Sequence, residues 1–503
     1  MKRRAIGGQI GAILVLTLLL TLAGNAAGQA GNPPLASFQQ TSSADWALGS
    51  SQKVDWRNLD ALHTPYGLGS DSRASVRLAS QPGTWTRQSG AEPSLPRGPT
   101  AAWDGNNVAE ATVLHDGSRF KMWYSGQDAA SNIWQMGLAT STNGLDWTRS
   151  AGNPVLAVGA EGEWDDQEVS FSCVLYDGTT YHTWYSGFDG ARRCIGYASS
   201  PDGIAWTKHA GPVLSGSPGA WDEDLAGNPT VLHDGTAYHM WYGGWDNANG
   251  HWRIGHATSP NGQEWAKDPA NPVLDLGPAD AWDDTHVTAP SVLYDGTTFH
   301  MWYAGWDDQD YGASSHGSTG HATSMDGSAW TKDAANPVFV AQGGVWDPMW
   351  VVDPEIIFDG DLYHLWYTGG VTWTGLQIGY ATAPPVYEGS GSYISPLLDS
   401  GCPSETIPLW DGLRVQQTRN DQTIVYALLD QAGQPIPGFD NLTADAWEHI
   451  FDLSGLSAAY RQVYLRATLG TVDSTRSPVL EEWQIIWICY DLPYSFYLPV
   501  VRN

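Results

Sequence analysis

The sequence predicts an all-β protein in which a five-bladed β-propeller is followed by a smaller antiparallel β-sandwich. Asp-Gly pairs begin at Asp116, Asp177, Asp234, Asp295 and Asp359, at spacings of 61, 57, 61 and 64 residues. A fixed period of this length indicates a repeat architecture. The repeats lack the 3.6-residue apolar period of a helix and consist of short apolar runs between turn residues, which is typical of strands.

Each repeat divides into four strands. It begins with Trp-Asp and continues with an apolar run such as APSVLYDG (289–296) and a second run such as TTFHMWYAG (297–305). A third run such as IGYASS (195–200) and a final DGIAWTK (202–208) complete it. Four short strands with turns between them form one propeller blade.

The ends of the repeat region predict a closed ring. The fifth repeat reaches IGYATA (378–383) and then meets Pro384 without a fourth strand, whereas residues 81–98 resemble an isolated fourth strand. We expect this N-terminal stretch to complete the last blade, because a closed ring leaves no sheet edge exposed. The propeller would then occupy residues 81–385.

The remaining segments differ in composition from the repeats. Beyond residue 385, alternating runs broken by Gly, Pro and Asn predict an antiparallel sandwich, and Cys402 and Cys489 flank it as candidates for a disulfide. The expected organisation is a signal peptide (1–30), a linker or irregular N-terminal wrap (31–80), the propeller (81–385), the sandwich (386–492) and an apolar tail (493–503).

The first thirty residues have the layout of a secretory signal peptide. A basic start, MKRR, precedes an apolar run from Ile10 to Leu22 and small residues that end at Ala30. The apolar run is shorter than the ~20 residues that a membrane span requires. We therefore expect a secreted or extracytoplasmic chain, with retention at the cell surface left open, and no membrane insertion after cleavage.

The net charge of the chain makes some classes of binding partner unfavourable. The formal net charge is −30 for 503 residues, and loss of Lys2, Arg3 and Arg4 with the signal peptide would make it −33. A chain so acidic repels nucleic acid and anionic membranes. Carbohydrate is the better partner, and the sequence leaves the oligomeric state open.

Six tryptophans fall outside the repeat pattern. Fifteen of the 27 tryptophans recur at three equivalent positions of the repeats and are expected to pack between blades. When the loops are sorted by strand order, the six unrepeated ones all fall at one mouth of the ring, where they would stack on sugar rings or pack loops together. The candidate substrate-binding residues are Trp134, Trp245, Asn228, His286, Trp306, Trp350 and Trp373, with Trp252 as the sixth tryptophan.

The acids that vary between repeats are the candidate catalytic residues. The Asp of each Trp-Asp and Asp-Gly pair is repeated, which indicates a turn or cap role. Six residues before each Asp-Gly stand Glu110, Phe171, Asn228, Ala289 and Asp353. Only the first and last repeats, which are neighbours in a closed ring, carry an acid there.

Glu110 and Asp353 are thus predicted as the catalytic pair, since glycosidic cleavage uses one protonated and one ionised carboxyl group. Glu168, Asp224 and Glu355 are the supporting carboxylates. The alternative is a structural role, or binding of a structural calcium ion in the central channel by these oxygens; no cofactor is required. The chain has no G-x-S-x-G, H-E-x-x-H, paired C-x-x-C or phosphate-cradling glycine loop.

These motifs resemble a known superfamily. WDDTHVTAPSVLYDGTTFHMWYAG (282–305) and IGYASSPDGIAWTK (195–208) are similar to units of the five-bladed propeller glycoside hydrolases, which include arabinanases, β-xylosidases, levansucrases, invertases and the family 130 mannoside phosphorylases. The resemblance covers residues 81–385 and reaches families 43, 32, 68 and 130. It implies acids at the starts of inner strands, commonly an Asp before Pro.

Asp353-Pro354 resembles that Asp-Pro element but stands in the last repeat, whereas family 43 enzymes carry theirs in the first. Gly227-Asn228-Pro229 resembles the arabinanase E-G-P faintly, and the invertase-type W-M-N-D-P-N-G is absent. The predicted function is an exported glycosidase acting on arabinan, xylan, mannan or fructan. The alternative is a non-catalytic propeller that binds carbohydrate or another surface ligand.

Overall fold

The computed structural model describes residues 36–40, 50–52, 54–55, 76–78 and 80–491, apart from 89, 91, 117, 296, 308–315, 343–345, 373, 396, 403 and 405. These residues form strands, turns and bends and no helix, so the predicted all-β class is confirmed. The predicted signal peptide and C-terminal tail lie outside the described residues. None of the described segments is a helix with the length and apolarity to span a membrane.

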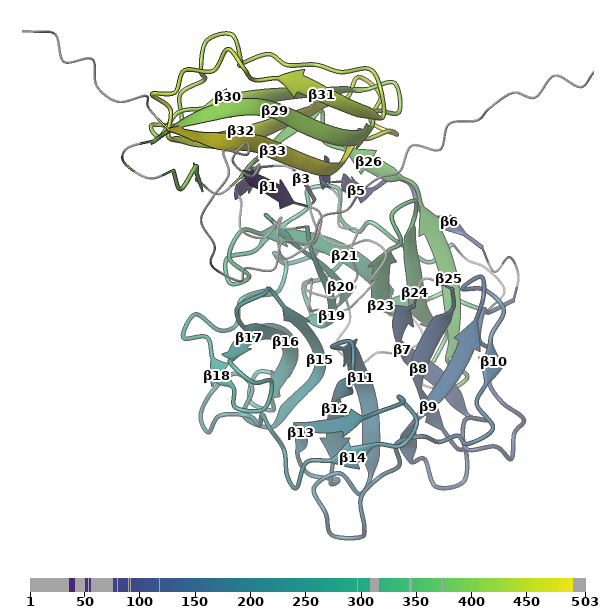
Figure 1. Ribbon diagram of the computed structural model, residues 1–503. Coiled ribbons are helices and arrows are strands. Elements are labelled where there is room, and N and C mark those ends of the chain that lie inside the picture. The colour runs from purple at the N-terminus through teal and green to yellow at the C-terminus, as the bar shows by residue number, and fades with distance from the viewer. Residues whose placement is uncertain are drawn as a thin grey trace, which may run out of the picture.

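Five units of antiparallel strands, called units 1 to 5 here, follow one another along the chain (Figure 1). In each unit the first three strands pair in chain order, and a two-residue fourth strand pairs with the third. Unit 1 comprises β7 (Asn107–His115), β8 (Phe120–Gln127), β9 (Trp134–Ser141) and β10 (Thr148–Arg149); unit 2 comprises β11 (Glu168–Tyr176), β12 (Tyr181–Phe188), β13 (Arg193–Ser200) and β14 (Thr207–Lys208); unit 3 comprises β15 (Leu225–His233), β16 (Tyr238–Asp246), β17 (His251–Ser259) and β18 (Ala266–Lys267); unit 4 comprises β19 (His286–Tyr294), β20 (Phe299–Trp306), β21 (Gly317–Ser324) and β22 (Thr331–Lys332); unit 5 comprises β23 (Trp350–Phe358), β24 (Tyr363–Gly370) and β25 (Gln377–Ala383).

Unit 5 takes its fourth strand from the N-terminal side of the chain. Strand β6 (Thr86–Arg87) pairs antiparallel with β25 through Thr86 opposite Thr382 and Arg87 opposite Ala381. The strand that the fifth repeat lacks is therefore supplied by residues nearly 300 positions earlier in the sequence.

Side-chain hydrogen bonds link the first strands of neighbouring units. The N–H of Val174 donates to Thr112 Oγ1 at 3.3 Å, and that of Ile356 donates to Ser291 Oγ at 3.1 Å. The same bond joins units 5 and 1, where the N–H of Val113 donates to Glu355 Oε1 at 2.9 Å. The first strands β7, β11, β15, β19 and β23 accordingly surround the middle of the assembly (Figure 1).

The repeated Trp-Asp acids hold each unit together. Each carboxylate accepts a hydrogen bond from the Tyr of the second strand and contacts a Lys or Arg of the fourth. In unit 5 the tyrosine is Tyr367, at 2.9 Å from Asp347 Oδ2, and the cation is Arg87 of β6, at 3.2 Å. The five acids with this role are Asp104, Asp165, Asp222, Asp283 and Asp347.

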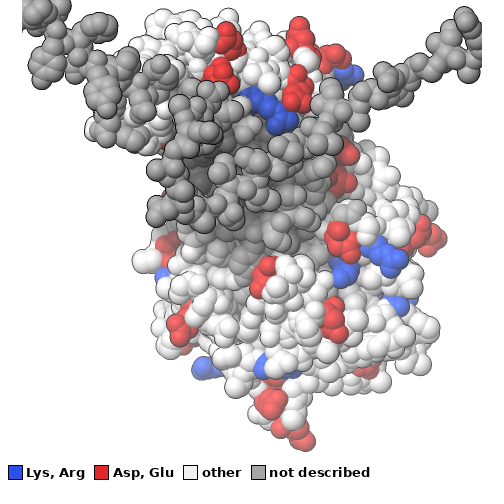
Figure 2. Space-filling view, viewed as in Figure 1, with Lys and Arg blue, Asp and Glu red and all other residues white. Residues whose placement is uncertain are grey.

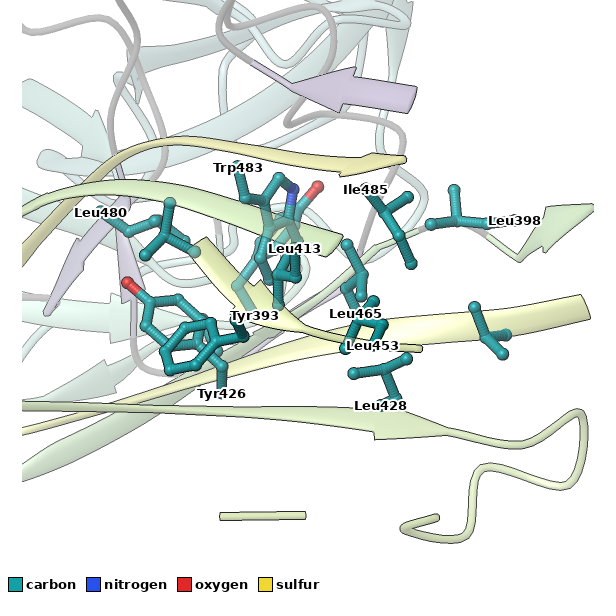
Figure 3. Close-up of a cluster of buried hydrophobic side chains, with 14 of the residues drawn as sticks. Tyr393, Leu398, Leu413, Tyr426, Leu428, Leu453, Leu465, Leu480, Trp483 and Ile485 are labelled. Atoms are coloured by element: carbon teal, nitrogen blue, oxygen red, sulfur yellow. The ribbon is translucent and has the colours of Figure 1, made fainter. Parts of the chain in front are cut away.

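The residues beyond unit 5 form two sheets over a shared core. One sheet holds β29, β31 and β33 and the other holds β27, β28, β30 and β32. Leu413 and Trp483 from the first sheet and Tyr426 and Leu465 from the second belong to one buried cluster (Figure 3). The strands are β26 (Pro385–Tyr387), β27 (Ser390–Ile394), β28 (Leu398–Asp399), β29 (Thr406–Thr418), β30 (Thr423–Leu429), β31 (Glu448–Asp452), β32 (Gln462–Gly470) and β33 (Val479–Asp491).

A disulfide joins Cys402 to Cys489, so the suggested pairing of these two residues is confirmed. The other two cysteines, Cys173 and Cys194, are free thiols.

The stretch expected to be a linker or irregular wrap contributes strands to these sheets. Strand β1 (Ala36–Gln40) pairs with β33, and β2 (Ser50–Gln52) pairs with β27. Strands β3 (Val54–Asp55) and β4 (Val76–Leu78) pair with each other, and β4 also pairs with β33; β5 (Ser80–Pro82) pairs with β26. The described parts of residues 31–80 are therefore strands that extend the C-terminal sheets or pair with β26.

Acidic side chains are scattered over both parts of the molecule on the face shown in Figure 2, and basic side chains there are few. The distribution agrees with the net charge of −30. The described residues form no broad cationic surface on this face.

Candidate active site

A β-bulge interrupts the first strand of every unit at the same place. Pairing with the second strand shifts between Ala109 and Thr112 in unit 1 and between Val352 and Glu355 in unit 5, and the other three units shift at the equivalent residues. A bulge re-aims side chains beside a ladder. The bulged residues are Glu110, Phe171, Asn228, Ala289 and Asp353.

All five bulged residues have left-handed backbone conformations, with φ between 43° and 57°. This conformation is uncommon for residues other than glycine and costs free energy, so it persists only where the surrounding structure enforces it. For three of the five residues, a hydroxyl group of the neighbouring unit holds this backbone. The backbone N–H of Glu110 donates to Thr368 Oγ1 at 3.0 Å, and that of Asn228 donates to Ser186 Oγ at 2.8 Å.

The bulged residues line a cavity of about 40 Å³ on the axis of the ring. A second layer of the same cavity comes from the residues two positions further along the first strands of four units. This layer consists of Thr112, Cys173, Thr230 and Glu355. Glu110, Asp353 and Glu355 therefore line one small cavity, and its volume suits water molecules but not a sugar ring.

Glu110 is only 8% exposed and lies among fixed donors. Its Oε2 accepts the backbone N–H of Phe171 at 3.0 Å, and the hydroxyl of Ser125 also bonds the carboxyl group. Burial raises the pKa of Glu110 well above its usual range, and the negative charges of Asp353 and Glu168 raise it further. Glu110 therefore keeps its proton to a higher pH than an ordinary glutamate does.

Asp353 is half-buried as a residue, but its carboxyl group is deep enough that burial raises its pKa to about 7. A hydrogen bond from Thr368 acts in the opposite direction by stabilising the ionised form. Two carboxyl groups that repel each other across a small cavity lose their protons in separate steps. The pair can therefore hold one proton at neutral pH.

The predicted supporting acids occupy three different environments. Glu168 is buried and forms an ion pair with Arg193, whose Nη2 lies 2.8 Å from Oε2. Glu355 accepts the N–H of Val113 and a hydroxyl of Ser291 at 3.3 Å, and burial raises its pKa to about 7. Asp224 is half-buried in the loop before β15 and accepts the N–H of Asn247 at 2.7 Å, away from the axial cavity lining.

Asn228 lies on the cavity wall as a buried amide. Its Nδ2 donates to Thr288 Oγ1 at 3.0 Å, and its Oδ1 has no hydrogen-bond partner among the described residues. The buried hydroxyl of Ser172, also on the wall, has none there either. Buried polar atoms in this situation are commonly satisfied by water.

Three predicted substrate-binding residues need correction. Trp306 and Trp350 are 3% and 1% exposed and belong to a buried apolar cluster with Ala289. His286 is fully buried, and its Nδ1 accepts the N–H of Trp252 at 3.2 Å. These side chains pack units together and offer no free face to a sugar, because aromatic area this large is buried whenever neighbouring units can cover it.

Trp134 and Trp245 keep part of their surface exposed. The ring of Trp245 lies 5.7 Å from that of Trp252, and its Nε1 donates to Asn247 Oδ1 at 3.2 Å. Trp134 packs beside the apolar cluster of Trp306. Trp373 lies outside the described residues.

Metal ligation has no support in the part of the chain that the structure describes. No three or more His, Cys, Asp or Glu side chains are grouped there as metal ligands would be. The channel calcium ion stays a prediction.

Sequence reasoning missed the hydroxyl groups that surround the acids. Ser125, Ser186 and Thr368 occupy the position after Trp-Tyr in the second strand, where units 3 and 4 have Gly243 and Ala304. The signal was present as a difference between repeats, but only the bulge explains why this position meets the neighbouring unit's bulged residue, which is Phe171, Asn228 or Glu110.

The arrangement can perform acid–base chemistry. Glu110, whose pKa is raised well above its usual range, and Asp353, which ionises near neutral pH, are two carboxyl groups with different environments, and such a pair is typical of an acid and a base. Each is the fourth residue of the first strand of its unit, and both line the same cavity.

Comparison with known proteins places the chain among relatives. No family model matches it. It is 31% identical over 228 residues to the uncharacterized proteins MT1551 and Rv1502 of Mycobacterium tuberculosis, which covers 43% of this chain and 72% of theirs. The chain belongs to the same family as these two proteins.

A second relative has a named activity. The 1,2-β-oligomannan phosphorylase of Thermoanaerobacter sp. is 31% identical over 130 residues, which covers 24% of this chain and 43% of that enzyme. This match agrees with the predicted resemblance to the propeller glycoside hydrolase superfamily with its mannoside phosphorylases, over less than half of that enzyme. It also agrees with the glycosidase-type enzyme class that the sequence predicts.

Among solved structures, the β-1,2-mannobiose phosphorylase of Listeria innocua is similar over 59% of this chain and 96% of its own, with 14% identity and a TM-score of 0.47.

Proposed function

We propose that the protein is a carbohydrate-active enzyme that cleaves glycosidic bonds with Glu110 and Asp353 at the axis of a five-bladed propeller. One observation carries the proposal: two acids at equivalent bulged positions of neighbouring units line one cavity, and burial raises the pKa of both. Structural ion pairs would lower these pKa values, whereas general acid catalysis needs a carboxyl group that holds its proton at working pH.

In the proposed reaction, Glu110 donates its proton to the leaving glycosidic oxygen while the bond to the anomeric carbon breaks. Ionised Asp353 then serves as base toward an attacking water or as the nucleophile. A cavity of about 40 Å³ is too small for the sugar itself, so the substrate sits at its mouth. Trp134 and Trp245 are the proposed stacking residues there, because both keep exposed surface.

Phosphorolysis is the second candidate, favoured by the match to the oligomannan phosphorylase. Inorganic phosphate would then attack in place of water and leave the sugar as its phosphate ester. Glu110 keeps the same role in both reactions, since the leaving oxygen needs a proton in either case. A non-catalytic carbohydrate-binding propeller is the alternative to both.

The wider proposal includes the architecture and location. Ring closure by β6 and the bonds between units support a five-bladed propeller at residues 81–385. Two sheets over one core support a sandwich at 386–492. The basic and apolar N-terminus supports export to a secreted or extracytoplasmic location.

The test is a substrate screen of the purified protein on arabinan, xylan, fructan, mannan and β-1,2-linked mannan oligosaccharides, each with and without inorganic phosphate. We expect turnover of at least one, with loss of about 100-fold or more in Glu110→Gln and Asp353→Asn. Sugar phosphate formed only with phosphate present would select phosphorolysis. Oligosaccharide binding without turnover in any mixture would instead support the non-catalytic alternative.

A further inference from the structure

A second cavity, of about 720 Å³, lies between unit 4 and the C-terminal sheets. One wall consists of the turn after β19 and the turn after β21, and the opposite wall consists of β27 and the paired part of β32. The C-terminal sheets lie on the side of units 4 and 5, away from unit 2 (Figure 1). Cavities of this volume accommodate small ligands and occur preferentially where two parts of a chain meet.

This cavity is separate from the axial one, although strand β19 reaches both. Ala289 lines the axial cavity, and Asp295, the residue directly after β19, lines the second one. The two residues are six positions apart, which corresponds to roughly 20 Å along a strand. The two cavities share no lining residue. A ligand in the second cavity therefore lies away from Glu110 and Asp353.

The wall formed by the sheets presents hydroxyl groups. Tyr393 of β27 belongs to the buried core, so Ser390 and Ser392 face the opposite way, because successive residues of a strand alternate between its two faces. Thr468 of β32 pairs with Ser392, which places their side chains next to each other. All three side chains line the cavity, and their hydroxyl groups have no hydrogen-bond partner among the described residues.

The wall formed by unit 4 adds a further hydroxyl group and a thioether. Met325 is 74% exposed, and the hydroxyl of Thr298 donates to its Sδ at 3.7 Å. The backbone N–H of Thr298 donates to Asp295 Oδ1 at 2.7 Å, which fixes the turn. A flexible apolar side chain is thus held beside polar groups at the edge of the cavity.

The charges on the walls indicate the class of ligand. Asp295 and Glu388 both line the cavity, and its described lining contains no Lys or Arg. His300 is the one imidazole there, and its Nε2 lies 3.5 Å from Asp295. Two acids without a strong cation disfavour phosphate and other anions. Carboxylate and hydroxyl oxygens accept hydrogen bonds from hydroxyl groups, and the thioether packs against C–H groups, so the lining suits a neutral saccharide.

We propose that this cavity is a second carbohydrate-binding site, which holds a neutral saccharide between unit 4 and the C-terminal sheets. The site goes beyond the proposed function, because it binds a saccharide whether or not the axial acids cleave one. In an active enzyme it would hold a second part of the same polymer and keep that polymer near the axis. Only this last consequence rests on the proposed function.

The experiment measures oligosaccharide binding to the full chain by isothermal titration calorimetry. Asp353→Asn is present throughout, so that no ligand is consumed. The ligands are neutral oligosaccharides of arabinan, xylan, fructan, mannan and β-1,2-linked mannan, and inorganic phosphate is titrated separately. Thr298→Leu and Ser392→Tyr each fill the cavity, from opposite walls. Circular dichroism verifies that each variant is folded.

Thr180→Leu is the matched control for Thr298→Leu. Thr180 occupies the same position in the turn of unit 2, where its N–H donates to Asp177 Oδ1 at 2.7 Å, and it does not line the cavity. Unit 5 has Leu362 at this position with the same bond to Asp359, so the turn accommodates leucine. Where Ser392→Tyr does not fold, Ser390→Tyr, at an exposed position of the same strand, takes its place.

We expect at least one oligosaccharide to bind, and each cavity variant to remove one bound ligand per chain or to raise its Kd about tenfold or more. Thr180→Leu should leave binding unchanged. Three results would overturn the inference: no oligosaccharide binding at all, binding that both cavity variants leave unchanged, or an equal loss in Thr180→Leu. Phosphate binding that the cavity variants remove would also overturn it, because the lining disfavours anions.

The two proposals fail in different ways. Oligosaccharide binding that the cavity variants remove, in a protein whose wild type turns over no glycoside, would keep the second site and refute the proposed function. Turnover by a wild-type enzyme whose binding ignores the cavity variants would refute only the inference.

Discussion

At the scale of single residues, the site is built from acids held in an environment that disfavours their charge. Glu110, Asp353 and Glu355 all have raised pKa values, and burial is the largest cause for each. The folded protein therefore holds protons that the unfolded chain releases near the ordinary carboxyl pKa of ~4. These groups therefore lower the stability of the folded protein at neutral and alkaline pH.

Asp353→Asn should for this reason stabilise the protein above neutral pH. A raised folded-state pKa means that the carboxyl group favours folding below its unfolded pKa and loses that contribution as pH rises toward about 7. Asparagine removes the charge, so we expect a melting temperature a few degrees higher at pH 8 and little changed at pH 4, by calorimetry. The exposed Asp361→Asn serves as control. A melting temperature at pH 8 equal to or below that of the wild type would contradict this account.

Glu110 and Asp353 could be selected as candidate residues from the sequence, because residues that differ between repeats at an equivalent position are visible without a structure. It could not separate packed tryptophans from exposed ones. Trp306 and Trp245 follow the same Ala/Gly-Gly pattern before an Asp, yet one is 3% exposed and the other half-exposed. The difference lies in what the neighbouring units cover, which no local pattern records.

At the scale of elements, the sequence repeat predicted the strands but not the β-bulges in them. The residue after the bulged one is Pro in units 3, 4 and 5, at Pro229, Pro290 and Pro354. Proline cannot donate a hydrogen bond to a β-ladder and is confined to sheet edges or bulges. These three prolines could therefore have indicated the bulges from the sequence. Counting back six residues from each Asp-Gly pair gave the equivalent position in every repeat, but not the left-handed backbone that the bulge places there.

The anchoring of β6 provides a prediction at this scale. Arg87→Met keeps the aliphatic stem but leaves the buried carboxylate of Asp347 with Tyr367 and without its cation. Removing one partner of a buried ion pair is costly, so we expect a loss of about 2–3 kcal/mol in the free energy of unfolding by urea titration. Arg192→Met, at an exposed arginine, should change it by less than about 0.5 kcal/mol. Equal effects of the two changes would refute the closing role of Arg87.

At the scale of the whole molecule, two rows of ionisable groups cross units 3 and 4. In unit 4, His300 Nδ1 lies 3.2 Å from His321 Nε2, and His321 Nδ1 lies 3.3 Å from Asp333. The other ring nitrogen of His300 lies 3.5 Å from Asp295. The hydrogen bond between the two rings needs one of the two facing nitrogens to be unprotonated, so protonation of both would remove it. Burial lowers the pKa of His321 to about 4.

Acid should therefore weaken the fold before the carboxylates titrate. A histidine with a lowered folded-state pKa contributes stability above its unfolded pKa of ~6.5, and that contribution falls as pH drops toward about 4. Units 2 and 5 have Tyr197 and Tyr380 where units 3 and 4 have His256 and His321, each opposite the Trp-Tyr tryptophan. His256→Tyr with His321→Tyr should reduce the fall in melting temperature between pH 7 and pH 5. A fall as steep as in the wild type would contradict this explanation.

The pairing of strands that lie far apart in the sequence could not be predicted from local patterns. Strand β1 pairs with β33 through Ala36 opposite Trp487, and a five-residue strand carries no information about a partner so distant. Ring closure was predictable because the fifth repeat ends one strand short. The pairing of the N-terminal strands β1 to β5 was not predictable, because the C-terminal sheets contain no repeat that would reveal a missing strand.

The most direct test of the acid pair compares Glu110→Gln with the wild type on two substrates of one sugar. The first is the natural oligosaccharide found in the screen, and the second is its dinitrophenyl glycoside, whose leaving group departs without a proton. A lost general acid should reduce kcat about 100-fold or more on the oligosaccharide and leave the dinitrophenyl glycoside near the wild-type rate. Equal loss on both substrates, or wild-type turnover of the oligosaccharide, would contradict the assignment of Glu110 as the acid.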